Sequence, residues 1–103
     1  MNPGPATAAK LIDQGAGRCA LAGDLTLATA DRLWNQLHAT GLLRTATHVD
    51  ANQLAKSDSA GLALLIAWRA VRRKHGGDLA ITSLPGRLKA LAHLTDAEEI
   101  VSG

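Results

Sequence analysis

The sequence has 103 residues, of which 47% are hydrophobic, and carries a formal net charge of +2 at pH 7. A chain of this length supports one domain, and its apolar content supports a packed core, which excludes global disorder. So small a positive charge gives no argument for nucleic-acid binding. Because Phe and Tyr are absent, we expect Leu, Ala, Val and Ile to fill the core around Trp34 and Trp68.

The cellular compartment is indicated by three features. A single cysteine, Cys19, excludes an internal disulfide and fits a reducing environment. Residues 1–9 lack the charged and apolar regions of a secretory signal, and we expect them to form a flexible tail before one domain over residues 10–103. No apolar run approaches the roughly 20 residues of a membrane span. We therefore expect a cytoplasmic protein that reaches a membrane only through a partner.

Hydrophobic periodicity predicts strands that alternate with helices, and hence an α/β domain with helices packed on a sheet. The expected strands cover residues 10–13, 18–23, 45–51 and 78–83, with a short closing segment at Ile100-Val101. The expected helices cover residues 28–40, 59–75 and 86–94, and the expected loops include residues 24–29 and 52–57. Gly41 is expected to end the first helix, and either Thr26 or Thr29 is expected to cap its start.

No constellation of residues predicts an enzyme, a metal site or a bound cofactor. Cys19 stands in the middle of a strand, where a buried apolar role is expected. The four histidines lack ligand-like spacing, and no Gly-rich phosphate loop is present. The basic residues from Arg69 to Lys74 occupy the last turns of a helix, where cations are favoured, so they predict a solvated helix end rather than a nucleic-acid site.

The segment between the third expected strand and the second expected helix is the most informative. Ser57, Asp58 and Ser59 supply side-chain oxygens where that helix begins, as capping residues do. A hydroxyl at Ser59, or a phosphate on it, would meet free N–H groups and the positive end of the helix dipole. Gly61 leaves the backbone open to close approach.

The helix that follows has apolar residues on two sides. One side is the expected core stripe, formed by Ala60, Leu64, Ala67, Trp68 and Val71. Leu62, Leu65 and Ile66 are expected on the opposite side, where a surface helix normally carries polar residues. Two interpretations stay open: a neighbouring segment covers these three side chains, or they form an exposed patch that binds another protein.

Three blocks of the sequence, in order, resemble the STAS family. They are Gly23-Asp24-Leu25-Thr26, where STAS proteins carry Gly-Glu-Leu-Asp; Val49-Asp50 followed by Asp58-Ser59-Ala60-Gly61-Leu62; and the helix end Arg72–Asp78. The resemblance covers residues 18–101. It implies the STAS fold, a mixed four- to five-stranded sheet flanked by three to four helices.

The resemblance also implies a function in binding proteins. A Gly-x-Leu-Thr turn followed by Leu33-Trp34 is similar to Mla-type members, which implies a non-enzymatic subunit that binds the cytoplasmic ATPase of a phospholipid ABC transporter. The implied interface is Asp58, Ser59, Ala60, Gly61, Leu62, Leu65 and Ile66, with Asp24 and Thr26 in a nearby turn. The alternative is an anti-sigma factor antagonist, in which a kinase phosphorylates Ser59; Thr26, in place of the second acid of Gly-Glu-Leu-Asp, argues against it.

Overall fold

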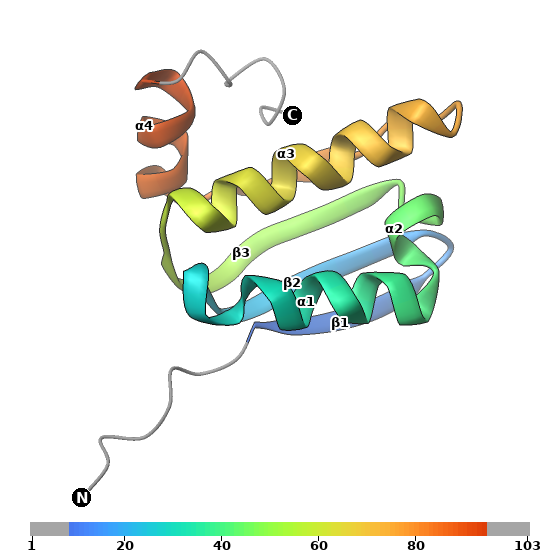
Figure 1. Cartoon of the computed structure of the whole chain (residues 1–103), viewed down its shortest axis with the longest axis horizontal. Coiled ribbons are helices and arrows are strands. Elements are labelled where there is room, and N and C mark those ends of the chain that lie inside the picture. Colours follow the sequence, from blue (N-terminus) through green and yellow to red (C-terminus); the bar gives the residue numbers. More distant parts are fainter. Residues whose placement is uncertain (1–8, 95–103) are drawn as a thin grey trace, which may run out of the picture.

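The computed structural model describes residues 9–94, which form strands and helices in alternation (Figure 1). The strands are β1 (Lys10–Gly15), β2 (Arg18–Leu25), β3 (His48–Ser57) and β4 (Ala80–Thr82). The helices are α1 (Leu27–Thr40), α2 (Leu42–Thr45), α3 (Ser59–Lys74) and α4 (Gly86–Leu94). The short segment expected at Ile100-Val101 lies outside the described residues. In the part that is described, no helix combines the length and the hydropathy of a membrane span.

The strands form one mixed sheet in the order β1-β2-β3-β4, which confirms the expected class. β1 pairs with β2 in antiparallel orientation across a tight turn, whereas β2–β3 and β3–β4 are parallel pairs. Parallel neighbours need a crossover, and α1 and α3 supply the two crossovers. Both helices lie side by side on the same face of the sheet (Figure 1).

The core lies between this face of the sheet and the helices, and leucine dominates it. Trp68 of α3 is fully buried, and its indole N–H donates a 3.2 Å hydrogen bond to the carbonyl oxygen of Leu42 in α2. That bond gives the one polar atom of a large buried aromatic ring a partner. Cys19 is 1% exposed, which confirms its expected apolar role.

The connection between β2 and α1 is shorter than expected. The loop predicted over residues 24–29 is wrong, because β2 continues to Leu25 and α1 begins at Leu27. At the other end, Gly41 adopts the left-handed conformation (φ 78°) and ends α1 as predicted. The short helix α2, which follows directly, has only four residues and was not predicted.

The loop predicted over residues 52–57 is also wrong, since β3 runs on to Ser57. Its pairing with β2 shifts register twice, so extra residues bulge out of the strand. These bulges expose the neighbours Asn52 and Gln53, and then Ala55 and Lys56. Two consecutive exposed residues break the period-2 pattern by which a half-buried strand is recognised.

The start of α3 packs closely against the end of β2. Gly61 is buried there, and a Cβ at this position would overlap the carbonyl oxygen of Leu25 and lie 3.0 Å from Leu25 Cγ. The glycine of the Asp-Ser-x-Gly-Leu turn therefore serves packing within this chain. The close approach that the sequence predicted at Gly61 is made by β2.

We predict that Gly61→Ala lowers the free energy of unfolding by about 1–3 kcal/mol, the usual cost of overpacking. Gly86→Ala is the matched control, because a Cβ at that position meets nothing within 4 Å. Urea denaturation of the two variants measures the difference. Equal stability of Gly61→Ala and the wild type would contradict the close contact between α3 and Leu25.

Candidate functional site

The candidate site lies at the edge of the sheet where β2 and β3 end and α1 and α3 begin. The Asp58 carboxylate joins the two helices there. Its Oδ1 accepts hydrogen bonds from the backbone N–H groups of Ala60 (2.9 Å) and Gly61 (3.2 Å), which caps α3. Its Oδ2 accepts the N–H of Leu27, the first residue of α1, at 3.1 Å. One side chain therefore fixes the start of one helix against the start of the other.

The environment of Asp58 keeps it ionised. Partial burial of the carboxylate acts to raise its pKa, but the N–H groups of Leu27, Gly61 and Ala60 and the positive charge of Arg87 outweigh this effect. The net result is a pKa below the ordinary aspartate value. An ionised carboxylate is the stronger acceptor for three N–H donors, so charge and geometry act together.

The nearby turn of Asp24 and Thr26 is held by a third residue. Thr29 is buried, and its hydroxyl donates to the carbonyl oxygen of Asp24 (2.6 Å) and accepts the N–H of Thr26 (3.0 Å). Thr26 is the N-cap residue of α1, while Asp24 is 5% exposed at the end of β2. Both threonines that the sequence offered as alternatives thus take part in starting α1.

Ser59, the first residue of α3, is exposed to solvent. No hydrogen bond of its hydroxyl is found among residues 9–94, whereas Ser57 is buried at the end of β3. Of the three residues expected to cap α3, only Asp58 does so. The Ser59 hydroxyl therefore takes no part in capping α3.

The exposed patch expected at Leu62, Leu65 and Ile66 is not present. Leu62 is 4% exposed, Leu65 is completely buried, and Ile66 is half-buried against the core. For Leu62 and Leu65, the interpretation that another part of the chain covers the side chains is the correct one. Leu62 and Leu65 pack α3 against the rest of the protein, so they cannot contact a partner in this structure.

The reason is the central position of α3. It contacts β3, α1, α2 and α4, so its buried surface is much wider than the single stripe of a helix that meets one neighbour. Leu64 and Trp68 are buried as expected, but so are Leu62 and Leu65. The exposed residues of α3 are all small or charged. They are Ser59, Ala63, Ala67, Ala70, Arg73 and Lys74.

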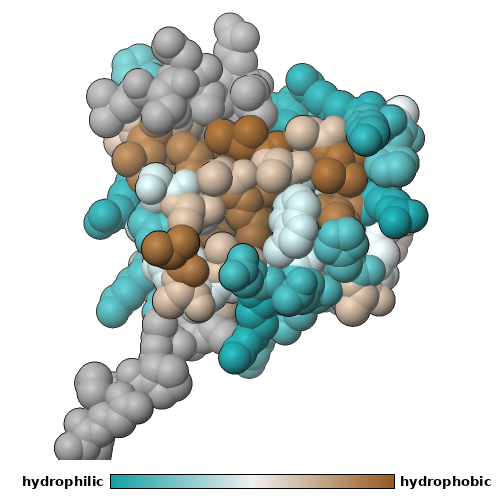
Figure 2. Space-filling model, in the orientation of Figure 1, coloured by the Kyte–Doolittle hydropathy of each residue, from teal (hydrophilic) through white to brown (hydrophobic). Residues whose placement is uncertain are grey.

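An apolar groove does reach the surface, between α1 and α3. We call it the α1–α3 groove; its volume is about 260 Å³, and it is lined by Ala30, Asp31, Trp34, Ala60, Ala63, Leu64 and Ala67. Leu27, at the start of α1, is 78% exposed, and no other large hydrophobic side chain in the described part of the chain is exposed. Figure 2 shows this face, where apolar surface follows α3 and polar surface gathers toward the C-terminal end of α3.

Sequence reasoning missed Leu27, Trp34 and Ala63 as surface residues of the site. Leu27 stood in an expected loop, and Trp34 was expected in the core, although it is only half-buried. The spacing of Ala63, Ala67 and Ala70 marks one face of a helix that lacks bulky side chains. That face gave no hydrophobic signal because alanine fits core and surface equally well.

Other reactive groups have roles inside the fold. Arg69 and Arg73 both contact the Asp78 carboxylate (2.9 and 3.3 Å), and Arg72 donates to the carbonyl oxygen of Arg44. Burial, with a smaller effect of the Asp13 charge, raises the pKa of the Cys19 thiol to about 11, so it stays protonated at neutral pH. Within residues 9–94, no group of three His, Cys, Asp or Glu side chains is placed to hold a metal.

Comparison with solved structures supports the fold. The structure is similar to that titled "Structure of the Anti-Sigma Factor Antagonist SpoIIAA in its Unphosphorylated Form", with a TM-score of 0.70 and 11% sequence identity. The match covers 91% of this chain and 85% of that chain. At this identity the likeness establishes the fold alone.

Comparison with family models identifies the family, although no curated protein matches the chain. The model described as "Mlab, STAS domain" matches residues 9–102, which is nearly the whole chain. Within the matched residues, the turn Asp58-Ser59-Ala60-Gly61 has Asp58 and Gly61 serving the fold and Ser59 facing solvent. The chain belongs to the STAS domain family.

Proposed function

We propose that this chain is a non-enzymatic docking subunit that binds the cytoplasmic ATPase of an Mla-type phospholipid ABC transporter and supports its assembly and activity. It would lie at the inner membrane only through that partner. The observation that carries the proposal is the exposed apolar α1–α3 groove beside the exposed hydroxyl of Ser59. The choice of partner rests on the family model, whose description names Mlab.

The groove has the features of a protein interface. Leu27 does not line the groove but lies one helical turn before Ala30, which does, and it would contribute about 1.5–3 kcal/mol if a partner buried it fully. Trp34 forms one wall, and partly exposed aromatic side chains commonly dominate the binding energy of interfaces. Alanines on the α3 side let the backbone of a partner approach closely, and Leu64 provides an apolar floor.

The surface is also formed before binding. Asp58 fixes the first residue of α1 to the first turn of α3, so the two walls of the groove are joined at the Ser59 end. A preformed surface costs less ordering entropy on association than a flexible one. We therefore assign Asp58 a positioning role, while Ser59 and the groove side chains make the contacts.

A second candidate is an anti-sigma factor antagonist that is switched by phosphorylation of Ser59. One observation favours it: the hydroxyl is exposed at a helix N-terminus, where a kinase can reach it. The similar structure named above is of an antagonist in its unphosphorylated form. The two candidates differ in what Ser59→Ala does.

Ser59→Ala should weaken binding to the transporter ATPase about fivefold, as expected for one lost neutral hydrogen bond. Ser59→Glu should weaken it more, because a new charge must be desolvated against the partner. A pull-down with a purified Mla-type transporter ATPase measures both effects, and thermal melts verify that both variants remain folded. If both variants bind like the wild type, Ser59 is not part of the interface.

The second candidate predicts a different outcome for the same variants. Ser59→Ala would bind the anti-sigma kinase as well as the wild type does, but would accept no phosphate from ATP. Ser59→Glu would mimic the modified form and release that partner. Phosphorylation of the wild type by a kinase encoded nearby, together with no binding to any ABC ATPase, would establish this candidate instead.

The groove is tested by a charge at its centre. We predict that Ala63→Glu weakens ATPase binding about a hundredfold, because a desolvated charge in an interface typically costs several kcal/mol. Ala90→Glu on α4 is the matched control, since both alanines are exposed on helices and only Ala63 lines the groove. If the two variants bind equally, the groove is not the docking surface.

The positioning role of Asp58 is tested by Asp58→Asn, which should lower stability by about 1 kcal/mol at pH 7, the usual cost of a lost cap. Because the pKa of Asp58 is lower in the folded state, its carboxylate contributes fully to the free energy of unfolding above its unfolded-state pKa of about 4. This contribution is lost as the pH falls through the folded-state pKa. The stability gap between wild type and Asp58→Asn should therefore narrow below about pH 4 in urea melts. A stability difference between the two proteins that stays constant down to the lowest pH at which both still fold would contradict this role.

A further inference from the structure

A second cleft lies on the opposite flank of α1 from the groove. It has a volume of about 470 Å³ and is formed by the outermost strand, β1, and by α1. Its lining residues are Ala9, Lys10, Leu11, Arg32, Gln36, Ala39 and Thr40. We call it the β1–α1 cleft. It shares no lining residue with the α1–α3 groove.

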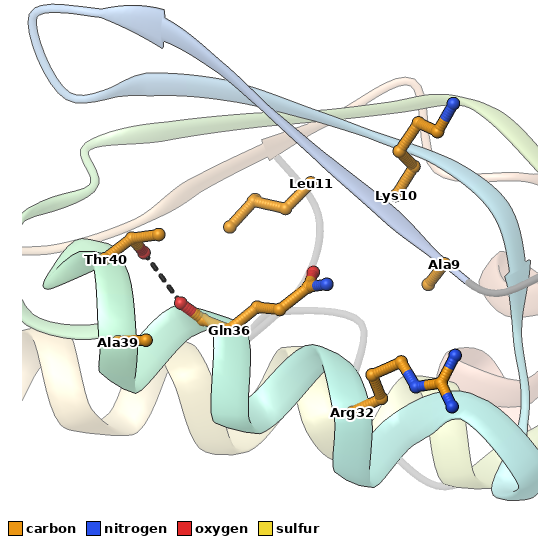
Figure 3. Close-up of a pocket in the computed structure, with 7 residues that line it drawn as sticks. All are labelled: Ala9, Lys10, Leu11, Arg32, Gln36, Ala39 and Thr40. Atoms are coloured by element: carbon orange, nitrogen blue, oxygen red, sulfur yellow. Dashed lines mark hydrogen bonds between the residues drawn. The ribbon is translucent and has the colours of Figure 1, made fainter.

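The cleft combines an apolar floor with donors at its mouth. Figure 3 shows Leu11 pointing from β1 into the space above the helix, and Arg32 and Gln36 reaching from α1 toward β1. Lys10 directs its amine away from α1, and Thr40 donates its hydroxyl hydrogen to the Gln36 carbonyl oxygen at 2.8 Å (Figure 3). Nothing acidic lines the cleft, and neither ion pair found in residues 9–94 involves Arg32. The cleft is therefore suited to an anionic group attached to an apolar one.

The wall formed by β1 adds a backbone template. Among residues 9–94, β1 is an edge of the sheet, so alternate N–H and C=O groups of Lys10–Asp13 point outward without a partner strand from that part of the chain. An extended peptide can add to such an edge through main-chain hydrogen bonds, and its alternate side chains then enter the neighbouring pocket. An edge strand with a pocket beside it is an arrangement that suits this binding mode.

We propose that the β1–α1 cleft binds an extended acidic segment of a partner protein. The segment adds to β1 as a fifth strand, places an apolar side chain over Leu11 and Ala39, and pairs a carboxylate with Arg32. Residues 1–8 of the chain itself do not fit this description, because they contain no acidic residue and include Pro3 and Pro5, which cannot donate to a ladder.

The test uses the full chain and a labelled peptide of alternating Val and Glu, six residues long. Fluorescence anisotropy at low salt gives its dissociation constant. Arg32→Glu should weaken binding at least about tenfold, since it removes a charge-assisted hydrogen bond and adds repulsion. Lys89→Glu on α4 is the matched control for net charge and should bind like the wild type. Ala39→Phe, at an exposed position that lines the cleft, should block binding without unfolding the chain.

Amide hydrogen exchange locates the peptide. Outward N–H groups of β1 should become protected when the peptide adds as a strand, whereas amides of α3 should be unaffected. No binding up to about 1 mM, the weak end of specific affinities, would overturn the proposal. Equal binding by Arg32→Glu, or by a peptide with Lys in place of Glu, would also overturn it, and so would protection confined to α3.

Discussion

The hydrogen bonds of one carboxylate hold together the edge of the sheet where α1 and α3 begin. Asp58 accepts N–H groups from the first turn of α3 and from the first residue of α1, so two helices from separate crossovers start at one point. Four N–H groups at each helix start lack partners within the helix, and Asp58 satisfies three such groups in two helices. With Asp58 committed to this task, the adjacent Ser59 needs no capping role and its hydroxyl faces solvent.

Gly61 and Asp58 both fix the position of the start of α3 relative to the end of β2 and the start of α1. Gly61 lets α3 approach the carbonyl oxygen of Leu25, and β2 leads through Thr26 alone into Leu27. The turn Asp58-Ser59-Ala60-Gly61 thus divides into two residues that fix the backbone and two that face outward. This division gives a physical reason for the spacing of the motif: a cap, an exposed hydroxyl, a small groove residue and a residue without a Cβ.

Local patterns were sufficient for most of the fold. The boundaries of α1 and α3 follow from helical periodicity and from Gly41, and Cys19 was correctly placed in the core. The predictions that were wrong concern features that depend on tertiary contacts. The bulges of β3 depend on its pairing with β2, and the burial of Leu65 depends on α3 having neighbours on several sides. A helical wheel reports which residues share a face but not how many faces are covered, so the exposed patch was assigned to the wrong side of α3.

The same geometry explains why α1 is suited to serve two surfaces. Leu33 and Leu37 are completely buried beneath it, while Trp34 turns toward α3 and Arg32 and Gln36 turn toward β1. The two flanks differ in chemistry: the α3 side is apolar and holds Asp31, whereas the β1 side presents a guanidinium and an amide. A folded partner fits the first surface, because it is preformed and adjoins the rigid junction at Asp58. An extended segment fits the β1–α1 cleft, because the backbone N–H and C=O groups of an edge strand can form a regular row of hydrogen bonds with another extended backbone. The two proposals together would let one small domain hold a folded partner at the α1–α3 groove and an extended segment at the β1–α1 cleft.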